Sequence, residues 1–397
     1  MTTVIELTIA SNYVKDYKAG YPLIKKDFIK NTNVLKNEGS IVHLVDQNRN
    51  FIAKGYYGNQ NKGLGWVLTK NKAEAIDYSF FKSRIKEAMD SRIALYQSAD
   101  TTGFRVFNGE GDGIGGLTID YFAGYYLINW YSEGIYTFKD SVIRVLDELC
   151  EYRAIYEKKR FDTKGQYIDD DDFVKGTRGE FPIIIKENGM NYAVYLNDGA
   201  MVGVFLDQRQ VRKAIRDKYS EGKNVLNTFS YTGAFSVAAA LGGAAKTTNV
   251  DLAKRSQSKT IEQFSVNGID YEQQDIKVMD VFEYFKYAKR KELKFDLVIL
   301  DPPSFARSKK HTFSTAKDYS GLIKDTIAIT EKNGVIVAST NNASFGMKKF
   351  KGFIEKAFKE TQTNYRVLEE FNLPSDFKTH AHFPQSNYLK VVIVEKK

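Results

Sequence analysis

The chain has 397 residues, of which 43% are hydrophobic, so it is long enough for two or three globular domains with a sizeable core. Its 58 Lys and Arg residues outnumber its 49 Asp and Glu residues, and the net charge of +9 favours an anionic partner such as nucleic acid. It contains no apolar run of membrane-spanning length, and MTTVIELTIASNYVKDYKAG lacks the features of a signal peptide. We therefore expect a cytoplasmic protein without a membrane segment. The single cysteine, Cys150, excludes an internal disulfide, and the four histidines lack zinc-site spacing, so we expect no metal.

Residues 1–72 form the first block. They carry eleven Lys and Arg against five Asp and Glu, and they contain the strand-like runs SIVHLVDQ, NFIAKGYYG and GLGWVLT, separated by Asn and Gly turns. This pattern predicts a small β-rich module that faces RNA or DNA, with a solvated basic face as the alternative.

Residues 73–180 form the second block. An apolar period of three and four predicts a helix over residues 75–96, followed by strands over 103–108, 116–122 and 124–131 and a helix over 137–150. The glycine-rich segment 109–113 lacks the Gly-Lys-Ser/Thr of a phosphate loop, so we interpret it as a turn between strands. The polar segment 162–180 is a candidate linker or an ordered loop.

From residue 181 helices alternate with the apolar strands NVLNTF, KTTNVD, DLVILD and GVIVAST, and NYLKVVIVEK closes the chain. This alternation predicts an α/β fold with a doubly wound, Rossmann-like parallel sheet. In such a sheet ligands bind beyond the carboxyl ends of the strands. The turn from Thr228 to Gly233 and the acids Asp251 and Asp280 all follow predicted strands there. The turn has one glycine, which disfavours a nicotinamide dinucleotide.

The sequence Asp301-Pro302-Pro303-Ser304-Phe305 ends another predicted strand. Proline cannot donate ladder hydrogen bonds, so the sheet must stop there, and the proline carbonyls are expected to be free acceptors. An acid, free carbonyls and an aromatic ring are suited to holding a flat base with exocyclic N–H groups. The alternative is that the prolines merely end the strand and Phe305 belongs to the core.

The ordered motifs SYTGAFS, VDLAKRS, VMDVFEYF and LDPPSFARSKK resemble those of class I S-adenosylmethionine-dependent methyltransferases, specifically the RlmI-like and RlmK-like enzymes that modify large-subunit ribosomal RNA. GEGDGIGGLTIDYF and VFLDQRQVR are similar to further signatures of that family. The resemblance covers essentially the whole chain. It implies a PUA-like RNA-binding domain over residues 1–72, a small middle α/β domain over 73–180 and a Rossmann-like methyltransferase domain over 181–397.

The resemblance also implies roles for individual residues. Asp207, Gln208 and Arg209 correspond to the family's motif at the entry to the cofactor site. The alternative for Arg209 and Arg212 is that they are surface charges at the start of a helix. The implied S-adenosylmethionine site consists of Asp207, Arg209, Thr228, Phe229, Ser230, Tyr231, Thr232, Gly233, Phe235, Asp251, Asp280 and Asp301. The implied catalytic residues are Asp301, Pro302, Pro303 and Phe305, and Arg307, Lys309 and Lys310 are candidates for RNA binding or for a solvated loop.

These features together predict an enzyme that methylates an RNA base, in 23S ribosomal RNA by the resemblance. Methylation of cytosine C5, as in RlmI, requires a cysteine thiolate, but Ser339, Thr340 and Asn341 stand where that cysteine is expected. Methylation at nitrogen is therefore favoured over the 5-methylcytosine alternative. A non-catalytic RNA-binding or ribosome-assembly protein and a methyltransferase for protein or small molecules are the remaining alternatives. A homodimer is left open.

Overall fold

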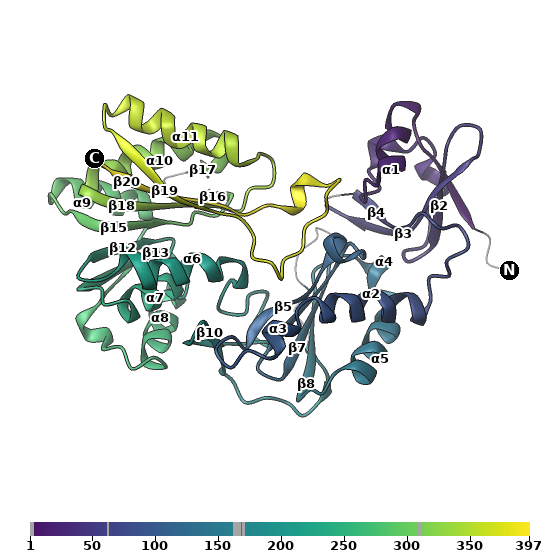
Figure 1. The fold of residues 1–397 in the computed structure, drawn as a ribbon, viewed down its shortest axis with the longest axis horizontal. Coiled ribbons are helices and arrows are strands. Elements are labelled where there is room, and N and C mark those ends of the chain that lie inside the picture. Colours follow the sequence, from purple (N-terminus) through teal and green to yellow (C-terminus); the bar gives the residue numbers. More distant parts are fainter. Residues whose placement is uncertain (1–3, 62, 162–167, 169–170, 308–311) are drawn as a thin grey trace. The chain divides into compact units, whose positions relative to one another are not determined.

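The computed structural model describes residues 4–61, 63–161, 168, 171–307 and 312–397 (Figure 1). Two compact units share the chain. The first contains residues 1–183, 195–202 and 375–386, and the second contains residues 184–194, 203–374 and 387–397. In the described part of the chain, no helix combines the length and the apolar character needed to cross a membrane.

The first unit begins with a four-stranded sheet of β1 (Ile5–Thr8), β2 (Ile41–Val45), β3 (Phe51–Gln60) and β4 (Gly63–Thr69) in that order. Strands β1 and β2 are parallel, and the other pairs are antiparallel. The short helix α1 (Val14–Ala19) lies in the β1–β2 connection. The three strand-like runs of the sequence are therefore strands, and β1 joins them as an edge strand whose Leu7 is buried in the core.

A second sheet in this unit orders β5 (Gly103–Asn108), β6 (Leu117–Phe122), β7 (Tyr125–Trp130), β8 (Ala154–Lys159) and β9 (Phe173–Gly176) as they occur in the chain. Helices α2 (Tyr78–Asp90), α3 (Ile93–Tyr96), α4 (Glu133–Tyr136) and α5 (Lys139–Leu149) accompany it. The predicted helix over residues 75–96 is thus two helices, and Arg92, which lies between them, is buried and pairs with Asp112 at 2.7 Å. Strand β9 lies inside the segment predicted to be a linker or ordered loop.

The glycine-rich segment 109–116 is a packing turn between β5 and β6. It begins with one 3₁₀ turn, Gly109–Asp112, rather than a phosphate-binding loop and helix. A Cβ on Gly115 would lie 2.1 Å from the Trp66 ring, so only glycine allows this close approach. The Tyr56 hydroxyl donates to the Gly115 carbonyl at 2.7 Å. These contacts join the first two sheets in one continuous hydrophobic core.

The second unit is built on a seven-stranded sheet with the order β14-β13-β12-β15-β18-β20-β19. Its strands are β12 (Asn224–Thr228), β13 (Lys246–Asp251), β14 (Asp275–Val278), β15 (Phe295–Leu300), β18 (Thr330–Thr340), β19 (Tyr365–Phe371) and β20 (Lys390–Lys396). The first five in this order are parallel, and β20 is antiparallel to both of its neighbours. A hairpin of β10 (Ile183–Glu187) and β11 (Met190–Val194) precedes this sheet in the chain.

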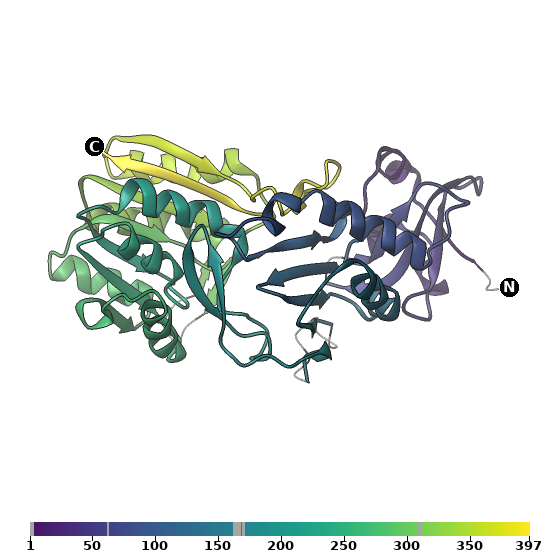
Figure 2. The same cartoon turned by 60° about the horizontal axis from the view of Figure 1, so that its bottom comes forward.

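Helices cover both faces of this sheet (Figures 1 and 2). One layer contains α9 (Val281–Arg290), α10 (Thr315–Ile329) and α11 (Met347–Glu360), and the other contains α6 (Arg209–Ala214), α7 (Ala234–Leu241) and α8 (Arg255–Ser265). The central strands β15 and β20 and the second half of β18 are buried on both faces, which explains their near-continuous apolar runs. This is the predicted Rossmann-like fold, with a strand-order reversal between β12 and its two neighbours.

Candidate functional site

The candidate site lies along the carboxyl ends of β12, β13, β14 and β15. Parallel pairing brings Thr228, Asp251 and Leu300 to one edge of the sheet, and Asp301 follows Leu300 directly. Asp280 follows the end of β14 by two residues. The structure therefore brings together at one edge the three acids that the sequence placed after strands.

The turn after β12 is strained in the way that functional turns often are. Phe229 and Tyr231 have φ values of 54° and 52°, which are unfavourable for residues other than glycine, and Gly233 has a φ of 80°. A Cβ on Gly233 would lie 2.7 Å from Thr260 Cγ2 of α8. This turn leads directly into helix α7, so that backbone N–H groups and a helix N-terminus face the edge of the sheet.

Two predicted cofactor residues in this turn use their hydroxyls within the protein. Thr228 Oγ1 donates to the Ile299 carbonyl at 2.8 Å, and Thr232 Oγ1 donates to the Gly203 carbonyl at 2.6 Å. Both side chains are buried. Thr228 and Thr232 therefore hold the turn in place.

The Asp251 carboxylate accepts two backbone hydrogen bonds. Its Oδ2 accepts the backbone N–H of Tyr231 at 2.9 Å, and its Oδ1 accepts the N–H of Ala253 at 2.8 Å. Each carboxylate oxygen retains a lone pair for a ligand hydroxyl. Asp280 caps helix α9, and its Oδ1 accepts the N–H of Phe282 at 2.9 Å.

The Asp301-to-Phe305 segment leaves the sheet as predicted. The Phe305 side chain is 61% exposed, so the interpretation of this ring as a core residue is wrong. The Pro303 carbonyl is engaged by Thr315 Oγ1 at 3.4 Å, whereas the sequence predicted it to be a free acceptor. Among the described residues, no backbone N–H donates to the Pro302 carbonyl.

The predicted RNA-binding residues fall at the limit of the described structure. Arg307 ends β16 (Phe305–Arg307), which pairs with β17 (Thr312–Ser314), but its side chain lies outside the described atoms. Lys309 and Lys310 lie outside the described residues.

Asp301 is the centre of a polar cluster. Gln208 Nε2 donates to Asp301 Oδ1 at 3.2 Å and to Ser339 Oγ at 2.8 Å. Burial is the main cause that raises the pKa of Asp301 to about 6, and the neighbouring Asp207 carboxylate acts in the same direction. Hydrogen bonds from Ser339 and Gln208 and the charge of Arg212 oppose this rise. A carboxyl group with this pKa can hold or release a proton near neutral pH.

The Asp207-Gln208-Arg209 motif is largely buried. The side chain of Asp207 accepts a hydrogen bond from the Tyr388 hydroxyl at 2.8 Å. Arg209 and Arg212 are 3% and 1% exposed, so the alternative that they are surface charges is wrong. Arg212 instead forms a buried bidentate pair with Glu187, at 2.7 and 2.6 Å.

Sequence reasoning missed Tyr388, which lies just before the last strand, and Lys390, which begins that strand. Lys390 is 2% exposed, and its Nζ donates to the carbonyls of Asn342 and Tyr388 at 2.8 and 2.6 Å. Burial lowers the pKa of Lys390 to about 8. A lysine inside the apolar run LKVVIV was the available signal, because such a position is unusual for a charge without a specific partner.

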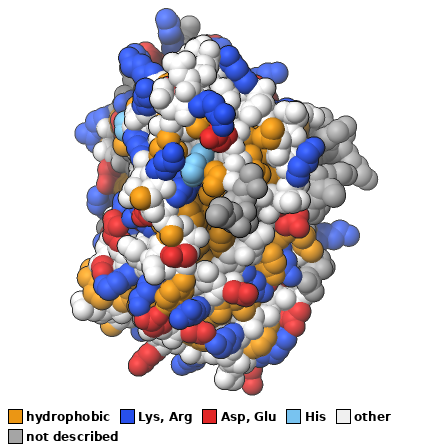
Figure 3. Space-filling model, turned by 90° about the vertical axis from the view of Figure 1, so that its right-hand side faces the viewer, with side chains coloured by type: hydrophobic (Ala, Val, Ile, Leu, Met, Phe, Trp, Pro, Cys, Tyr) orange, Lys and Arg blue, Asp and Glu red, His pale blue; other side chains and the backbone are white. Residues whose placement is uncertain are grey.

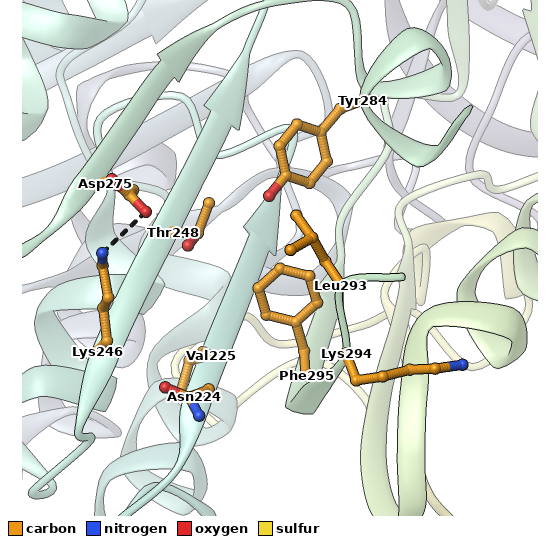
Figure 4. Close-up of a pocket in the computed structure, with 9 residues that line it drawn as sticks. All are labelled: Asn224, Val225, Lys246, Thr248, Asp275, Tyr284, Leu293, Lys294 and Phe295. Atoms are coloured by element: carbon orange, nitrogen blue, oxygen red, sulfur yellow. Dashed lines mark ion pairs between the residues drawn. The ribbon is translucent and has the colours of Figure 1, made fainter. Parts of the chain in front are cut away.

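A cavity of about 190 Å³ lies at the amino ends of the strands of the same sheet, opposite the carboxyl ends (Figure 4). Asn224, Lys246, Asp275 and Phe295 begin strands β12, β13, β14 and β15, and all four line it. The Lys246–Asp275 ion pair closes one side, and Leu293 and Phe295 form an apolar wall. This cavity is therefore separate from the edge that carries Asp251 and Asp301.

The carboxyl edge fits a nucleoside cofactor on its own geometry. In open α/β sheets, ligands bind at the carboxyl ends of the strands. This region of the protein contains the strained turn after β12, the Asp251 carboxylate with free lone pairs, and the start of α7. Asn249 Oδ1 is also buried without a hydrogen-bond partner among the described residues, and it lies 3.3 Å from the position of a Cβ on Gly233.

We expect Asp251→Ala to weaken the binding of S-adenosylmethionine by about 1 to 3 kcal/mol, because charge-assisted hydrogen bonds to the cofactor and the brace on Tyr231 are both removed. Isothermal titration calorimetry measures this directly. Asp270→Asn, which alters the exposed N-cap of the 3₁₀ turn η7 (Tyr271–Gln273), is the matched control and should bind normally. Unchanged affinity in Asp251→Ala would remove this residue from the site.

Comparisons with known proteins agree with this geometry. Residues 104–385 match the family described as S-adenosylmethionine-dependent methyltransferase, and residues 7–70 match the PUA-like domain. The "Putative ribosomal RNA large subunit methyltransferase YwbD" of Bacillus subtilis is 65% identical over 98% of this chain and 99% of that protein. The ribosomal RNA large subunit methyltransferase I of Aeromonas hydrophila is 30% identical over 91% of each chain.

Solved structures give the same result. The structure described as "SMU.776, a putative methyltransferase complexed with SAH" superposes with a TM-score of 0.91 at 39% identity, covering 99% of this chain and 100% of that chain. The chain is an enzyme that uses S-adenosylmethionine, and it belongs to the S-adenosylmethionine-dependent methyltransferase family, with a PUA-like domain at its N-terminus.

Proposed function

We propose that this enzyme methylates a nitrogen atom of a base in large-subunit ribosomal RNA, the 23S RNA. The names of the relatives in Bacillus subtilis and Aeromonas hydrophila support ribosomal RNA as the substrate class. The PUA-like domain and the positive net charge support an RNA partner. Our proposed domain boundaries are those predicted above, at residues 72 and 180.

The position of the single cysteine supports methylation at a nitrogen atom rather than at carbon C5. Cys150 caps helix α5 in the first unit, where burial raises the pKa of its thiol. Cytosine C5 methylation needs a thiolate beside the target base. In the unit that holds Asp301, the strand position expected for a cysteine is occupied by Ser339, whose hydroxyl accepts from Gln208. A nitrogen nucleophile needs no such covalent step.

The proposed mechanism relies on positioning at the carboxyl edge. Bound S-adenosylmethionine supplies an electrophilic methyl group. Asp301 accepts a hydrogen bond from the target N–H, which directs the nitrogen lone pair, and takes the proton released when nitrogen acquires the methyl group. The Pro302 carbonyl accepts a second N–H, and the exposed Phe305 ring stacks on the base.

The first unit offers a basic face for the RNA backbone. Lys15, Lys18, Lys26, Lys30, Lys36, Lys70 and Lys72 are exposed on or next to the β1–β4 sheet. Lys and Arg side chains are numerous on the upper part of the face drawn in Figure 3. Phosphate contacts of this kind position RNA without reading its sequence. A cytoplasmic location is part of this proposal because the substrate is ribosomal. A homodimer stays a prediction that sedimentation velocity can check.

Mass spectrometry of nucleosides from 23S RNA tests the proposed product. RNA from cells with and without this protein should differ by one N-methylated base. Cys150→Ser should retain full activity, since the proposed reaction assigns no role to this residue. Detection of 5-methylcytidine as the missing nucleoside, or an inactive but folded Cys150→Ser enzyme, would contradict methylation at nitrogen and favour the C5 alternative.

The salt dependence of RNA binding tests the basic face. We expect the triple substitution of Lys26, Lys30 and Lys36 by Gln to reduce the slope of log K against log salt by about 1 for each phosphate that these lysines neutralise, while cofactor binding stays intact. Filter binding with 23S RNA fragments measures the slope. Lys286→Gln with Lys356→Gln, on helices α9 and α11, removes similar exposed charges and serves as the control. An equal slope for all three proteins would place the RNA path elsewhere.

A further inference from the structure

Gln208 joins three elements at the carboxyl edge. It lies in the 3₁₀ turn Leu206–Gln208, and its side chain reaches both the residue after β15 and the end of β18. Its Nε2 donates to Asp301 Oδ1 at 3.2 Å and to Ser339 Oγ at 2.8 Å, so both amide protons are used. The residue is 4% exposed. These contacts fix the side chain in a single place beside Asp301.

The orientation of this amide is dictated by Asp301. If the amide were rotated by half a turn, Gln208 Oε1 would face an ionised carboxylate and repel it. In the observed orientation Oε1 is buried without a hydrogen-bond partner among the described residues. A buried acceptor without a donor destabilises a fold, and an apolar side chain of similar size would avoid that cost. The amide is therefore poorly explained by folding alone, whereas its N–H groups serve Asp301.

Ser339 completes the arrangement. Its hydroxyl accepts a hydrogen bond from Gln208 Nε2 at 2.8 Å, and its interaction with the Asp301 carboxyl lowers the pKa of that group. Its backbone carbonyl accepts the Tyr319 hydroxyl at 2.7 Å, which fixes the end of β18. In the proposed reaction, Ser339 therefore supports the Asp301 carboxylate, whereas a cysteine at this position would attack the base.

We propose that Gln208 and Ser339 are positioning residues that hold the Asp301 carboxylate ionised and aimed at the target nitrogen. This inference rests on the proposed function, in which Asp301 accepts the N–H of the base. It assigns Gln208 to the support of the carboxylate, a role different from that of a residue at the entry to the cofactor site. Neither residue needs to touch the substrate, because both act through Asp301.

The other groups around Asp301 set the expected size of the effect. Burial and the charge of Asp207 favour the protonated form, and the Arg212 guanidinium favours the ionised form. Tyr319 is also close enough to interact with Asp301, and burial raises the pKa of its phenol far above neutrality, so it stays uncharged. Losing one hydrogen bond to the carboxylate should move the titration of Asp301 upward by about one pH unit, a tenfold change in its ionisation equilibrium.

The test uses the full chain with Gln208→Met, Ser339→Ala and the control Thr326→Val. Thr326 is a buried residue on α10 whose hydroxyl bonds only to the Leu322 carbonyl within the described structure. The first readout is the pH profile of kcat for methyl transfer to 23S RNA from cells lacking this protein. We expect the acid limb to move upward by about one pH unit in Gln208→Met and Ser339→Ala, but not in Thr326→Val.

The second readout follows Asp301 without using activity. In each background, the difference in melting temperature between the Asp301→Asn variant and its parent is measured from about pH 4 to 9, and its midpoint reports the titration of Asp301. An upward shift of this midpoint in Gln208→Met supports the proposal. If the midpoint does not move, the proposal is overturned, whatever the activity. If the midpoint moves but the acid limb of kcat does not, the support of Asp301 is real and its assigned role in the reaction is wrong.

Discussion

Asp301→Asn should lower the rate of methyl transfer by about 10²- to 10⁴-fold, the usual range for a lost acid–base group. Asparagine has nearly the same shape and can still accept one hydrogen bond, but it cannot take the proton that the target nitrogen releases. Incorporation of tritiated methyl groups into undermethylated 23S RNA measures this effect. Asp90→Asn, an exposed residue of α2 that pairs with Lys86, is the control and should leave the rate unchanged.

The same substitution should stabilise the protein at high pH. The pKa of Asp301 is raised from 3.8 to about 6, so the folded state binds this proton more tightly than the unfolded state does. Stability from this group is therefore present at low pH and is lost as pH rises from about 4 to 6. Two pKa units correspond to about 3 kcal/mol, and partial exposure of Asp301 reduces the expected gain of Asp301→Asn to about 1 to 2 kcal/mol at pH 8.

Thermal unfolding at pH 8 and pH 4 separates the two states. We expect Asp301→Asn to be more stable than the parent at pH 8 but not at pH 4, and to lose most of its rate of methyl transfer. This result would identify Asp301 as a group kept for catalysis at a cost in stability. Full activity in Asp301→Asn would contradict its role as the proton acceptor. Equal stability of parent and variant at both values of pH would contradict the raised pKa.

Arg212→Met should destabilise the second unit by about 3 to 5 kcal/mol. The Arg212 and Glu187 side chains are 2% and 0% exposed, so removing the guanidinium leaves a carboxylate buried without its counter-charge. The Phe205 carbonyl also loses its donor at 2.7 Å. Urea unfolding followed by fluorescence or circular dichroism measures the change.

The double variant Arg212→Met with Glu187→Met distinguishes charge from packing. With both charges removed, no uncompensated ion remains, and apolar residues of similar volume should restore most of the stability. A double variant that is no more stable than Arg212→Met would show that the loss comes from packing against Tyr192 and Phe235, which lie 5.6 and 5.7 Å from the guanidinium carbon.

The large parallel sheet and the position of its ligand edge are predictable from the sequence. Apolar runs alternating with helices permit few arrangements, because crossovers between parallel strands are right-handed and place consecutive strands close together. Residues that directly follow such strands must then meet at one edge, which explains why the sequence predicts both Asp251 and Asp301 there. Strands β2, β3 and β4 of the PUA-like domain are similarly local, since each is separated from the next by a turn, whereas β1 pairs with β2 across the long connection that contains α1.

Other features depend on segments that are distant in the chain. The single long helix predicted over residues 75–96 is two helices, and Arg92 between them pairs with Asp112, a partner that no local propensity reveals. The sequence predicts a linker or loop where β9 lies, because pairing with β8, and not composition, makes this segment a strand. Side-chain burial is equally hidden, as the sequence alone does not distinguish a buried Arg212 from a solvated one.

The fold class, the ligand edge of the large sheet and the acids along that edge are predictable from the sequence, because they follow from periodicity and from the connection rules of parallel sheets. The surroundings of Asp301, in contrast, depend on tertiary packing. Gln208 and Ser339 are separated by 131 residues, and Gln208 and Asp301 by 93, so their contact depends on how a 3₁₀ turn packs against two strand ends. Packing of this kind is set by the whole core, whereas a sequence motif constrains only its own neighbours.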